Sequence, residues 1–548
     1  MTAKATDGTR EILERVPKNP PAYGAWNGQK VVLGTGESLL GPGPAAREAC
    51  PPITGEPGKW WAAERQSEGA VVAVTVGTTQ PGLSEAPLLH RCRRSWGGVL
   101  VSAQTARSIR QADGLDKTRA LQRVLYRSAK EDPTRRFHAL YGHVARSDVL
   151  ARAWDDVRAN RGAPGVDGVT IADVEASGVA AFLHELATAL ADRTYRPAPL
   201  RRVYIPKAGE TARNASRPLS IPTVRDRVAM TAAKIVLEPV FEADFLPVSF
   251  GFRPKRSAHM ACEAIRVEAN RGADWVLDAD LSNCFGSISH DALMTLIERR
   301  VSDRDMLKLL RSWLRVGVLE NGVVTDTVSG TPQGSPISPV LANIALHVLD
   351  EDFTHGGGKR LGVLVRYADD YVVLCRSRQR AEEARRRASQ VLAPLGLQLN
   401  PDKTRIACLT RGAAGFDFLG FHHHKVESWK WRGHWYLQRW PSRRAMRSVR
   451  AKVRDLTGRR FVGLPIEVVV GNLNRVLRGW SAYFRYGNSA RKFEDLDLYV
   501  HERLAILAST KHGKAGWNLG RFDWEWLGDL RVYRLQGKIR WGTPHAWR

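Results

Sequence analysis

The sequence has little cysteine and no long apolar run. Its six cysteines, at positions 50, 92, 262, 284, 375 and 408, are scattered and form no Cys-x-x-Cys pair. Neither a disulfide framework nor a zinc ribbon is therefore predicted. No apolar stretch approaches the ~18 residues of a membrane span, and the first residues lack the apolar core of a signal peptide. These absences predict a soluble cytoplasmic protein with no membrane partner.

Acidic residues are also scarce relative to basic ones. The chain has 548 residues, of which 83 are Lys or Arg and 56 are Asp or Glu, so its formal net charge is +27. Such an excess predicts a polyanionic partner, with nucleic acid as the first candidate and an anionic membrane surface as the second. The hydrophobic fraction of 43% is that of a globular protein, and the length is enough for several domains.

One acidic pair interrupts two β-rich apolar runs between Gly362 and Cys375. The β-branched and aromatic residues on either side predict a hairpin, with Asp369 and Asp370 at its tip. Taken alone, such a pair is more often a solvated turn. A carboxylate cluster that acts on phosphates needs a further acid from another strand, because two divalent cations about 3.5–4 Å apart need ligands from several directions.

The segment from Trp275 to Phe285 supplies that further acid. Strand alternation places Asp278 and Asp280 on one face and the intervening apolar residues on the other. Carboxylates within an apolar run are costly to bury unless they are paired or bind a metal. This placement favours a metal site built from both segments.

The motif Tyr367-Ala368-Asp369-Asp370, with Asp280 five residues before Phe285, resembles the palm of a reverse transcriptase. More specifically, the chain resembles the bacterial group II intron-encoded reverse transcriptase/maturase over roughly residues 120–510. An ordered set of such motifs is far more specific than any one of them. The supporting segments are Asn160-Arg-Gly-Ala-Pro-Gly-Val-Asp-Gly168, Arg217-Pro-Leu-Ser-Ile-Pro222, Ser249-Phe-Gly-Phe-Arg-Pro254, Gly330-Thr-Pro-Gln-Gly-Ser-Pro336, Asn400-Pro-Asp-Lys-Thr404, Phe418-Leu-Gly-Phe421 and Leu477-Arg-Gly-Trp480.

The resemblance implies an α+β fold: a right-hand polymerase with fingers and an antiparallel palm sheet, followed by an α-helical thumb and maturase (X) domain. We expect an irregular extension over 1–115, an N-terminal extension and fingers over 116–265, the palm over 266–430, the thumb and X domain over 431–512, and a basic, Trp-rich appendage over 513–548. Many relatives continue into a His-Asn-His endonuclease. This sequence stops before such an element, so no second-strand cleavage is expected.

By the same resemblance, Asp280, Asp369 and Asp370 are expected to be catalytic and to bind two Mg²⁺ ions, with Mn²⁺ as a substitute. The all-oxygen ligand set favours magnesium over zinc. Asp278 does not match the family's catalytic position and is expected to be structural or supporting. Expected nucleotide and primer-template contacts are Phe285, Gln333, Gly334, Tyr367, Lys403, Arg217, Arg253 and Lys207.

The segment Arg443 to Arg460 is strongly basic and contains one acid, Asp455. Because partners for i,i+4 ion pairs are nearly absent, a nucleic-acid-facing helix is favoured over a solvated one. Adjacent histidines on a strand point to opposite faces, so His422, His423 and His424 are expected at the surface or facing RNA rather than binding a metal. Expected RNA-binding residues are Arg443, Arg444, Arg447, Arg450, Lys452, Arg454, Arg475, Arg478 and Arg485.

The resemblance implies an RNA-directed DNA polymerase and intron maturase that binds its group II intron RNA, assists splicing and copies the RNA into DNA at a target site. Its partners would be intron RNA, target DNA and deoxynucleoside triphosphates. Two alternatives remain open: a host-recruited or defence reverse transcriptase with no intron partner, and an RNA-folding cofactor with vestigial polymerase activity. The maturase-like segment 441–504 argues against the first, and the intact acids argue against the second.

Overall fold

A computed structural model describes residues 103–206, 216–320, 322–325, 329–410, 413–513, 516 and 518–540, with side chains from Lys117 onward. The predictions for residues 1–102 and for Lys207 lie outside these residues. Within them, no helix is both long and apolar enough to cross a bilayer.

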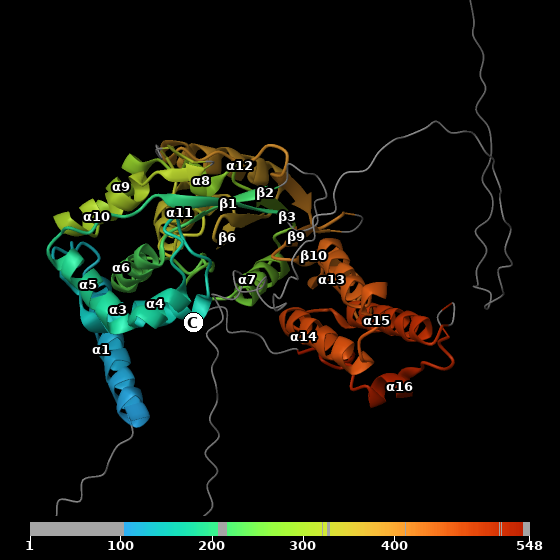
Figure 1. Ribbon diagram of the computed structural model, residues 1–548. Helices are drawn as coiled ribbons and strands as arrows, with labels where there is room; N and C mark the ends of the chain where they lie inside the picture. The colour runs from blue at the N-terminus through green and yellow to red at the C-terminus, as the bar shows by residue number, and fades with distance from the viewer. Residues whose placement is uncertain are drawn as a thin grey trace, which may run out of the picture. The chain divides into compact units, whose positions relative to one another are not determined.

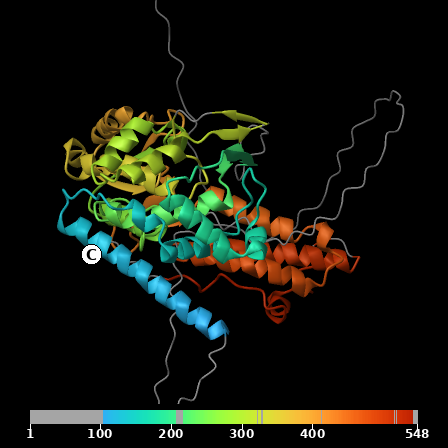
Figure 2. The same cartoon turned by 60° about the vertical axis from the view of Figure 1, so that its left-hand side comes forward.

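A helical region opens the described chain (Figure 1). Val149, Leu150 and Ala153 of one helix pack with Val228, Ala232 and Val236 of another in the main hydrophobic core. The long first helix, drawn in blue in Figure 2, packs against the same two helices. The helices are α1 (Ala103–Glu131), α2 (Tyr141–Val144), α3 (Ser147–Asn160), α4 (Ile171–Ser177), α5 (Val179–Ala191) and α6 (Val224–Glu242).

Two four-stranded sheets follow. The first has the order β2-β1-β4-β5, in which β1 is antiparallel to β2 and parallel to β4. The second has the order β6-β7-β3-β8 with every pair antiparallel. The strands are β1 (Leu200–Pro206), β2 (Ser216–Ile221), β3 (Trp275–Ala279), β4 (Val318–Glu320), β5 (Val323–Thr325), β6 (Val363–Tyr367), β7 (Asp370–Cys375) and β8 (Arg405–Cys408).

The second sheet is covered on both faces, which explains why its central strands are almost wholly apolar. Leu277 and Val373 enter one core together with α11 and α12, whereas Val276 and Val372 enter another core with α7. This arrangement confirms the predicted antiparallel palm sheet. The helices of this region are α7 (Ala258–Asn270), α8 (Cys284–Ser287), α9 (His290–Glu298), α10 (Arg304–Arg315), α11 (Ser338–Thr354) and α12 (Arg378–Leu392).

The C-terminal region begins with a three-stranded sheet of order β11-β10-β9 and continues as helices. Leu473, Leu477, Trp480 and Phe484 recur at intervals of three or four residues and form the buried stripe of α14. Figure 2 shows the long orange and red helices packed side by side. The elements are β9 (Phe416–Phe418), β10 (Phe421–Glu427), β11 (Trp435–Pro441), α13 (Arg443–Leu456), α14 (Ile466–Phe484), α15 (Ala490–Lys511) and α16 (Trp524–Asp529).

The described part of the tail is not an appendage. Leu527 and Leu535 belong to the same core as α14 and α15. Asp497 of α15 accepts backbone N–H bonds from Leu535 at 3.0 Å and from Gln536 at 2.9 Å. The expectation of a separate tail is therefore wrong for these residues, because their apolar side chains complete the helical core.

Candidate active site

Two buried strands end at the acidic turn. β6 and β7 pair in register up to Tyr367 opposite Asp370, so only Ala368 and Asp369 form the connection. Ala368 has a φ of 57°, the sign that a two-residue hairpin with the right twist requires at this position. The predicted hairpin is confirmed, with Asp369 half-buried and Asp370 exposed at its end.

The segment that carries Gly251 packs against the turn in close van der Waals contact. A Cβ on Gly251 would lie 2.2 Å from the backbone nitrogen of Ala368. Just before that glycine, Phe250 N donates to Arg366 O at 2.8 Å and Arg366 N donates to Val248 O at 2.8 Å. Glycine is therefore required at position 251, because any side chain would displace the acidic turn.

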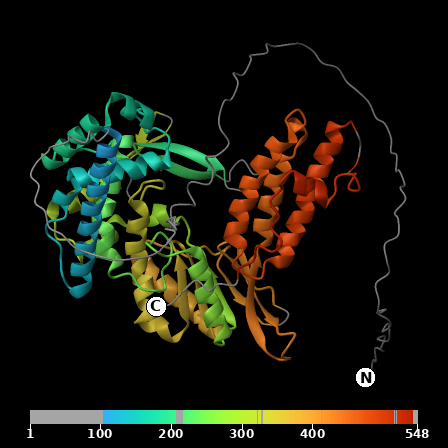
Figure 3. The ribbon, with the colours of Figure 1, turned by 90° about the horizontal axis from the view of Figure 1, so that it is seen from below.

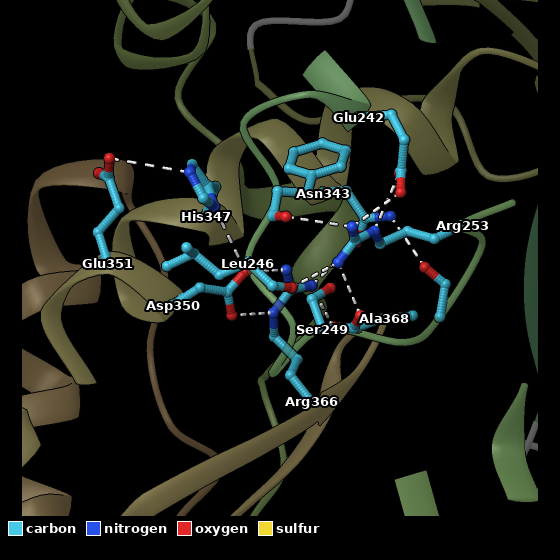
Figure 4. A network of polar contacts seen from close by, with 12 residues as sticks. Glu242, Leu246, Ser249, Arg253, Asn343, His347, Asp350, Glu351, Arg366 and Ala368 are labelled. Atoms are coloured by element: carbon cyan, nitrogen blue, oxygen red, sulfur yellow. Dashed lines mark hydrogen bonds and ion pairs between the residues drawn. The ribbon is translucent and has the colours of Figure 1, made fainter. Parts of the chain in front are cut away.

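A buried polar network holds the turn from below (Figure 4). Both Arg366 and Asp350 of α11 are 0% exposed, and Arg366 Nε lies 2.7 Å from Asp350 Oδ1. Arg366 Nη1 donates to Asn343 Oδ1 at 2.9 Å and to Ala368 O at 3.0 Å. Asn343 Nδ2 in turn donates to Gly251 O at 2.9 Å. The guanidinium therefore links the helix, the glycine segment and the turn.

Asp280 follows β3 and is fixed through its backbone by the Asn400–Thr404 segment. Asn400 N donates to Asp280 O at 2.8 Å. Lys403 Nζ reaches the carboxylate itself, at 3.0 Å from Asp280 Oδ2. Asp278, by contrast, is paired with Arg405 Nε at 2.9 Å, which agrees with the structural or supporting role expected for it.

The acids are electrostatically coupled. Burial and the nearby charge of Asp280 raise the pKa of Asp369, and Arg217 on β2 partly offsets this. Asp370 is exposed to solvent, yet the surrounding protein and the charges of Asp369 and Asp280 raise its pKa to about 7. Asp280, Asp369, Asp370 and Arg217 therefore interact electrostatically with one another. The negative charge of the three carboxylates favours binding of a cation.

No set of three or more His, Cys, Asp or Glu side chains in the described part of the chain already converges as a complete ion site. The residues nevertheless fit a divalent ion. Asp280, Asp369 and Asp370 offer carboxylate oxygens, which are suitable ligands for such an ion, and their negative charges repel one another when no cation is bound. One cation, the Lys403 ammonium, already forms an ion pair with Asp280. Ligands from a bound nucleotide would complete such a site, as is usual for magnesium.

Phe285 lies in α8 beside the Pro-Gln-Gly loop. Thr331 N donates to Phe285 O at 2.5 Å, and Gly330 packs on Gly286 so closely that a Cβ would lie 2.6 Å from its Cα. Cys284, immediately before Phe285, is near enough to the acids that burial and the charge of Asp369 raise its pKa to about 12. Phe285 is half-buried, and it packs in part against the main hydrophobic core.

The loop itself is anchored to the first sheet. Gln333 O accepts from Ser220 N of β2 at 2.7 Å, and Gly334 is exposed with a φ of 105°. Arg217 lies three residues before Ser220 on the same strand and is exposed. The loop that carries Gln333 and Gly334 is therefore bonded to β2, the strand that carries Arg217. Tyr367 is half-buried at the end of β6.

Arg253 corrects a prediction. Its side chain is 3% exposed and forms a 2.8 Å ion pair with Glu242, and its other donors reach the carbonyls of Leu246, Ser249 and Phe245. A guanidinium whose donors are taken up inside the protein is not available to a template phosphate. Arg253 therefore stabilises the segment that carries Gly251, and the expected template contact is wrong.

The histidine run is also partly corrected. His423 is 0% exposed and stacks on Phe416 at 5.1 Å between ring centroids, and burial holds its pKa well below the usual value. His422 and His424 lie on the opposite face and are half-buried. Alternation was predicted correctly, but one face of this strand belongs to the core.

The expected RNA-binding residues lie on two neighbouring helices and at the end of the second. Arg443, Arg444, Arg447 and Arg454 of α13 and Arg475 and Arg478 of α14 are exposed, whereas Arg450, Lys452 and Arg485 are half-buried. Arg450 lies over the Tyr499 ring at 5.3 Å and Arg478 over the Tyr533 ring at 5.6 Å. The predicted basic surface is therefore present, and part of it is held in place by aromatic rings.

Known protein families match both the region of the acidic site and the C-terminal helical region. Residues 205–423 match the family of reverse transcriptases (RNA-dependent DNA polymerases), and residues 446–524 match the group II intron maturase-specific domain. Protein YkfC of Escherichia coli (strain K12) is 33% identical over 338 residues, which cover 55% of this chain and 86% of YkfC.

The group II intron-encoded protein LtrA of Lactococcus lactis subsp. cremoris is 38% identical over 235 residues, which cover 43% of this chain but only 38% of LtrA. A solved partial Cas6-RT-Cas1–Cas2 complex has a TM-score of 0.30 to this chain, at 23% identity over 46% of this chain and 40% of that one. The chain belongs to the reverse transcriptase family, and its C-terminal region carries a group II intron maturase-specific domain.

Proposed function

We propose that this protein binds a group II intron RNA, assists its splicing, and copies the RNA into DNA at a target site. One observation carries the proposal: the acid-bearing turn of a reverse transcriptase and a maturase-specific domain with exposed arginines occur in the same chain. Intron RNA, target DNA and deoxynucleoside triphosphates are the proposed partners.

Within this proposal, Asp280, Asp369 and Asp370 supply the oxygen ligands for two divalent ions, for which we propose Mg²⁺ with Mn²⁺ as a substitute, because every donor is a carboxylate. When bound, such ions lower the pKa of the primer 3′-hydroxyl and neutralise charge on the leaving pyrophosphate. Lys403 and Arg217 add fixed positive charge where the triphosphate would arrive. We propose that the Phe285 ring contacts the sugar of the incoming nucleotide and that Gln333, Gly334 and Tyr367 contact the nascent base pair.

The basic residues of α13 and α14 would bind folded intron RNA chiefly through phosphates. The experiment that tests this compares Arg443→Gln/Arg444→Gln/Arg447→Gln with Arg376→Gln/Arg380→Gln/Arg385→Gln. The second variant removes the same charge from exposed positions just before α12 and within it. Splicing of the intron that surrounds the reading frame is measured at low magnesium, together with primer extension on a short RNA template.

We expect the α13 variant to lose splicing and to show a flatter salt dependence of RNA binding, by a slope of roughly 0.7–0.9 per lost contact, while extension survives. If splicing persists and extension is lost instead, the maturase assignment of this surface is wrong. If the unmodified protein extends primers but binds no intron RNA, the result would favour a host-recruited or defence reverse transcriptase. A parent that splices without extending primers would leave the RNA-folding cofactor.

A further inference from the structure

The loop joining β10 to β11 presents two tryptophans to solvent. Trp429 is 90% exposed and Trp431 is 63% exposed, which is unusual because indole rings are normally largely buried. The loop is nevertheless built by defined hydrogen bonds. Ser428 Oγ accepts from Lys430 N at 3.3 Å and from Trp431 N at 3.2 Å, and Ser428 N donates to His434 O at 2.8 Å. The exposure of the indoles is therefore a property of the folded loop.

The two strands that this loop joins carry four aromatic rings, together with a valine and a glutamine, on one face. His422 pairs with Trp440, His424 with Gln438 and Val426 with Tyr436, and all six side chains are half-buried. The His422 ring lies 5.2 Å from that of Trp440 and 6.4 Å from that of His424. The opposite face carries Phe421, His423 and Leu437 and is buried. The β10–β11 ribbon, residues 421–441, thus has one core face and one partly open aromatic face.

This aromatic face runs the length of the ribbon, from Trp440 to the exposed indoles. Seven-residue strands extend roughly 20 Å at about 3.3 Å per residue. The two orange strands are seen running together in Figure 3. At the base of the ribbon, Ser442 N donates to Gly420 O at 2.9 Å and Tyr483 Oη donates to Leu419 O at 2.9 Å, so the ribbon is tied to α14.

Cations accompany the rings at the tip. Lys430 and Arg432 alternate with the two tryptophans and are exposed, and Lys430 Nζ lies 5.2 Å from the Trp431 ring centroid. Among the described residues, no carboxylate forms an ion pair with Lys430 or Arg432. Alternating aromatic and cationic side chains suit single-stranded nucleic acid, whose bases stack on rings while cations contact the phosphates. The net charge of +27 favours the same partner over a basic or neutral protein surface.

We propose that the β10–β11 ribbon is a stacking track for unpaired nucleotides, with Trp429 and Trp431 as its terminal platforms. Most of the ribbon lies between the two family matches, which end at residue 423 and resume at residue 446. The track binds bases by their flat faces and so accepts any sequence. It extends nucleic-acid contact beyond the acidic site and beyond the basic surface of α13 and α14.

The test measures binding of the full chain to a 12-nucleotide oligo(U), a 12-nucleotide oligo(dT) and a 12-base-pair duplex. We expect Trp429→Ala/Trp431→Ala to bind single strands about 5- to 150-fold more weakly per lost stacked base, with duplex binding little changed. Trp429→Phe/Trp431→Phe should retain most of the affinity, because a smaller ring still stacks. Tyr126→Ala, which removes a 42% exposed ring from α1, is the matched control and should bind as the parent does.

The two single strands distinguish the sources. A loss confined to oligo(U) identifies template RNA, a loss confined to oligo(dT) identifies a DNA strand, and either supports the track. Lys430→Gln/Arg432→Gln should flatten the salt dependence by roughly 0.7 per lost contact. Because both indoles are exposed, the double alanine variant is expected to melt with the parent.

Single-strand binding within twofold of the parent would overturn the proposal. A change in self-association of the chain with unchanged oligonucleotide binding would also overturn it, in favour of a protein contact. Primer extension on a preannealed template is recorded in parallel. Its absence in the parent would count against the proposed polymerase function alone, because oligonucleotide binding is measured without catalysis.

Discussion

Arg366 and Asp350 form a fully buried ion pair directly beneath the turn that carries Asp369 (Figure 4). The same guanidinium donates from Nη1 to the carbonyl oxygen of Ala368. That carbonyl belongs to the peptide group whose nitrogen is the Asp369 backbone nitrogen. The pair therefore fixes the backbone at a proposed metal ligand, and its orientation is set by a helix, α11, rather than by the turn alone.

The first prediction separates positioning from stability. Arg366→Lys keeps the charge but loses the fork that reaches Asp350, Asn343 and Ala368 together. Arg253→Lys is the matched control, because Arg253 is also buried and bonded to a carboxylate and carbonyls but makes no direct bond to the turn. We expect both variants to melt earlier. At a temperature where both are folded, only Arg366→Lys should lower kcat, by about 10- to 100-fold, with a raised magnesium requirement.

A milder variant keeps this test usable if Arg366→Lys does not fold. Asn343→Ala leaves the ion pair intact and removes only the bonds to Arg366 Nη1 and to Gly251 O. It should lower kcat by a smaller factor in the same direction. Equal kcat values for folded parent, Asn343→Ala and Arg366→Lys would show that the network stabilises the fold without positioning the acid.

Local pattern and resemblance predicted the acidic hairpin and the palm sheet, because the strands that form them show short-range periodicity. They missed Arg366 and Asp350, since an arginine on a strand is ordinarily expected at the surface. A signal was present: Asn343, His347 and Asp350 recur at i, i+4 and i+7, and the other residues between positions 340 and 349 of this helix are apolar. Arg253 was wrongly expected to contact the template, because the backbone carbonyls that bind it come together only in the folded protein. His423 was wrongly expected at the surface, because tertiary packing decides which face of a strand is buried.

The second prediction concerns sugar selection by Phe285. If its ring excludes a 2′-hydroxyl, Phe285→Val should raise ribonucleotide use relative to deoxynucleotide use by roughly 10- to 200-fold, the range for a single shape contact. The ratio of kcat/KM values for the two nucleotides measures this. Phe285 also packs on the main core, so melting is compared first. A folded variant with the parental ratio would assign the ring to packing alone.

The third prediction follows from the raised pKa of Asp370, about 7 in the folded protein. The unfolded chain releases this proton near pH 4, so between these values the folded state binds the proton more tightly. Stability without metal should therefore fall as pH rises from about 4 to about 7. Asp370→Asn removes the charge, and in EDTA it should melt above the parent at pH 8 and with the parent at pH 4.5.

Divalent ions should reverse that order. At pH 8 the parent should gain more thermal stability from added Mg²⁺ than Asp370→Asn gains, because the neutral amide is a weaker ligand. Thermal melts with and without the ion measure both effects. Melting temperatures of parent and variant that coincide at pH 8 in EDTA would mean that the carboxylates do not repel one another as described.

The most direct measurement of the central claim is primer extension on an RNA template by the parent, Asp369→Asn and Asp402→Asn. Asp402 is an exposed acid in the same Asn400–Thr404 segment that supports Asp280, so its variant matches the change in charge without altering a proposed ligand. The account predicts parental extension for Asp402→Asn, extension below detection for Asp369→Asn, and equal melting temperatures within a few degrees. Near-parental extension by folded Asp369→Asn in magnesium would contradict it.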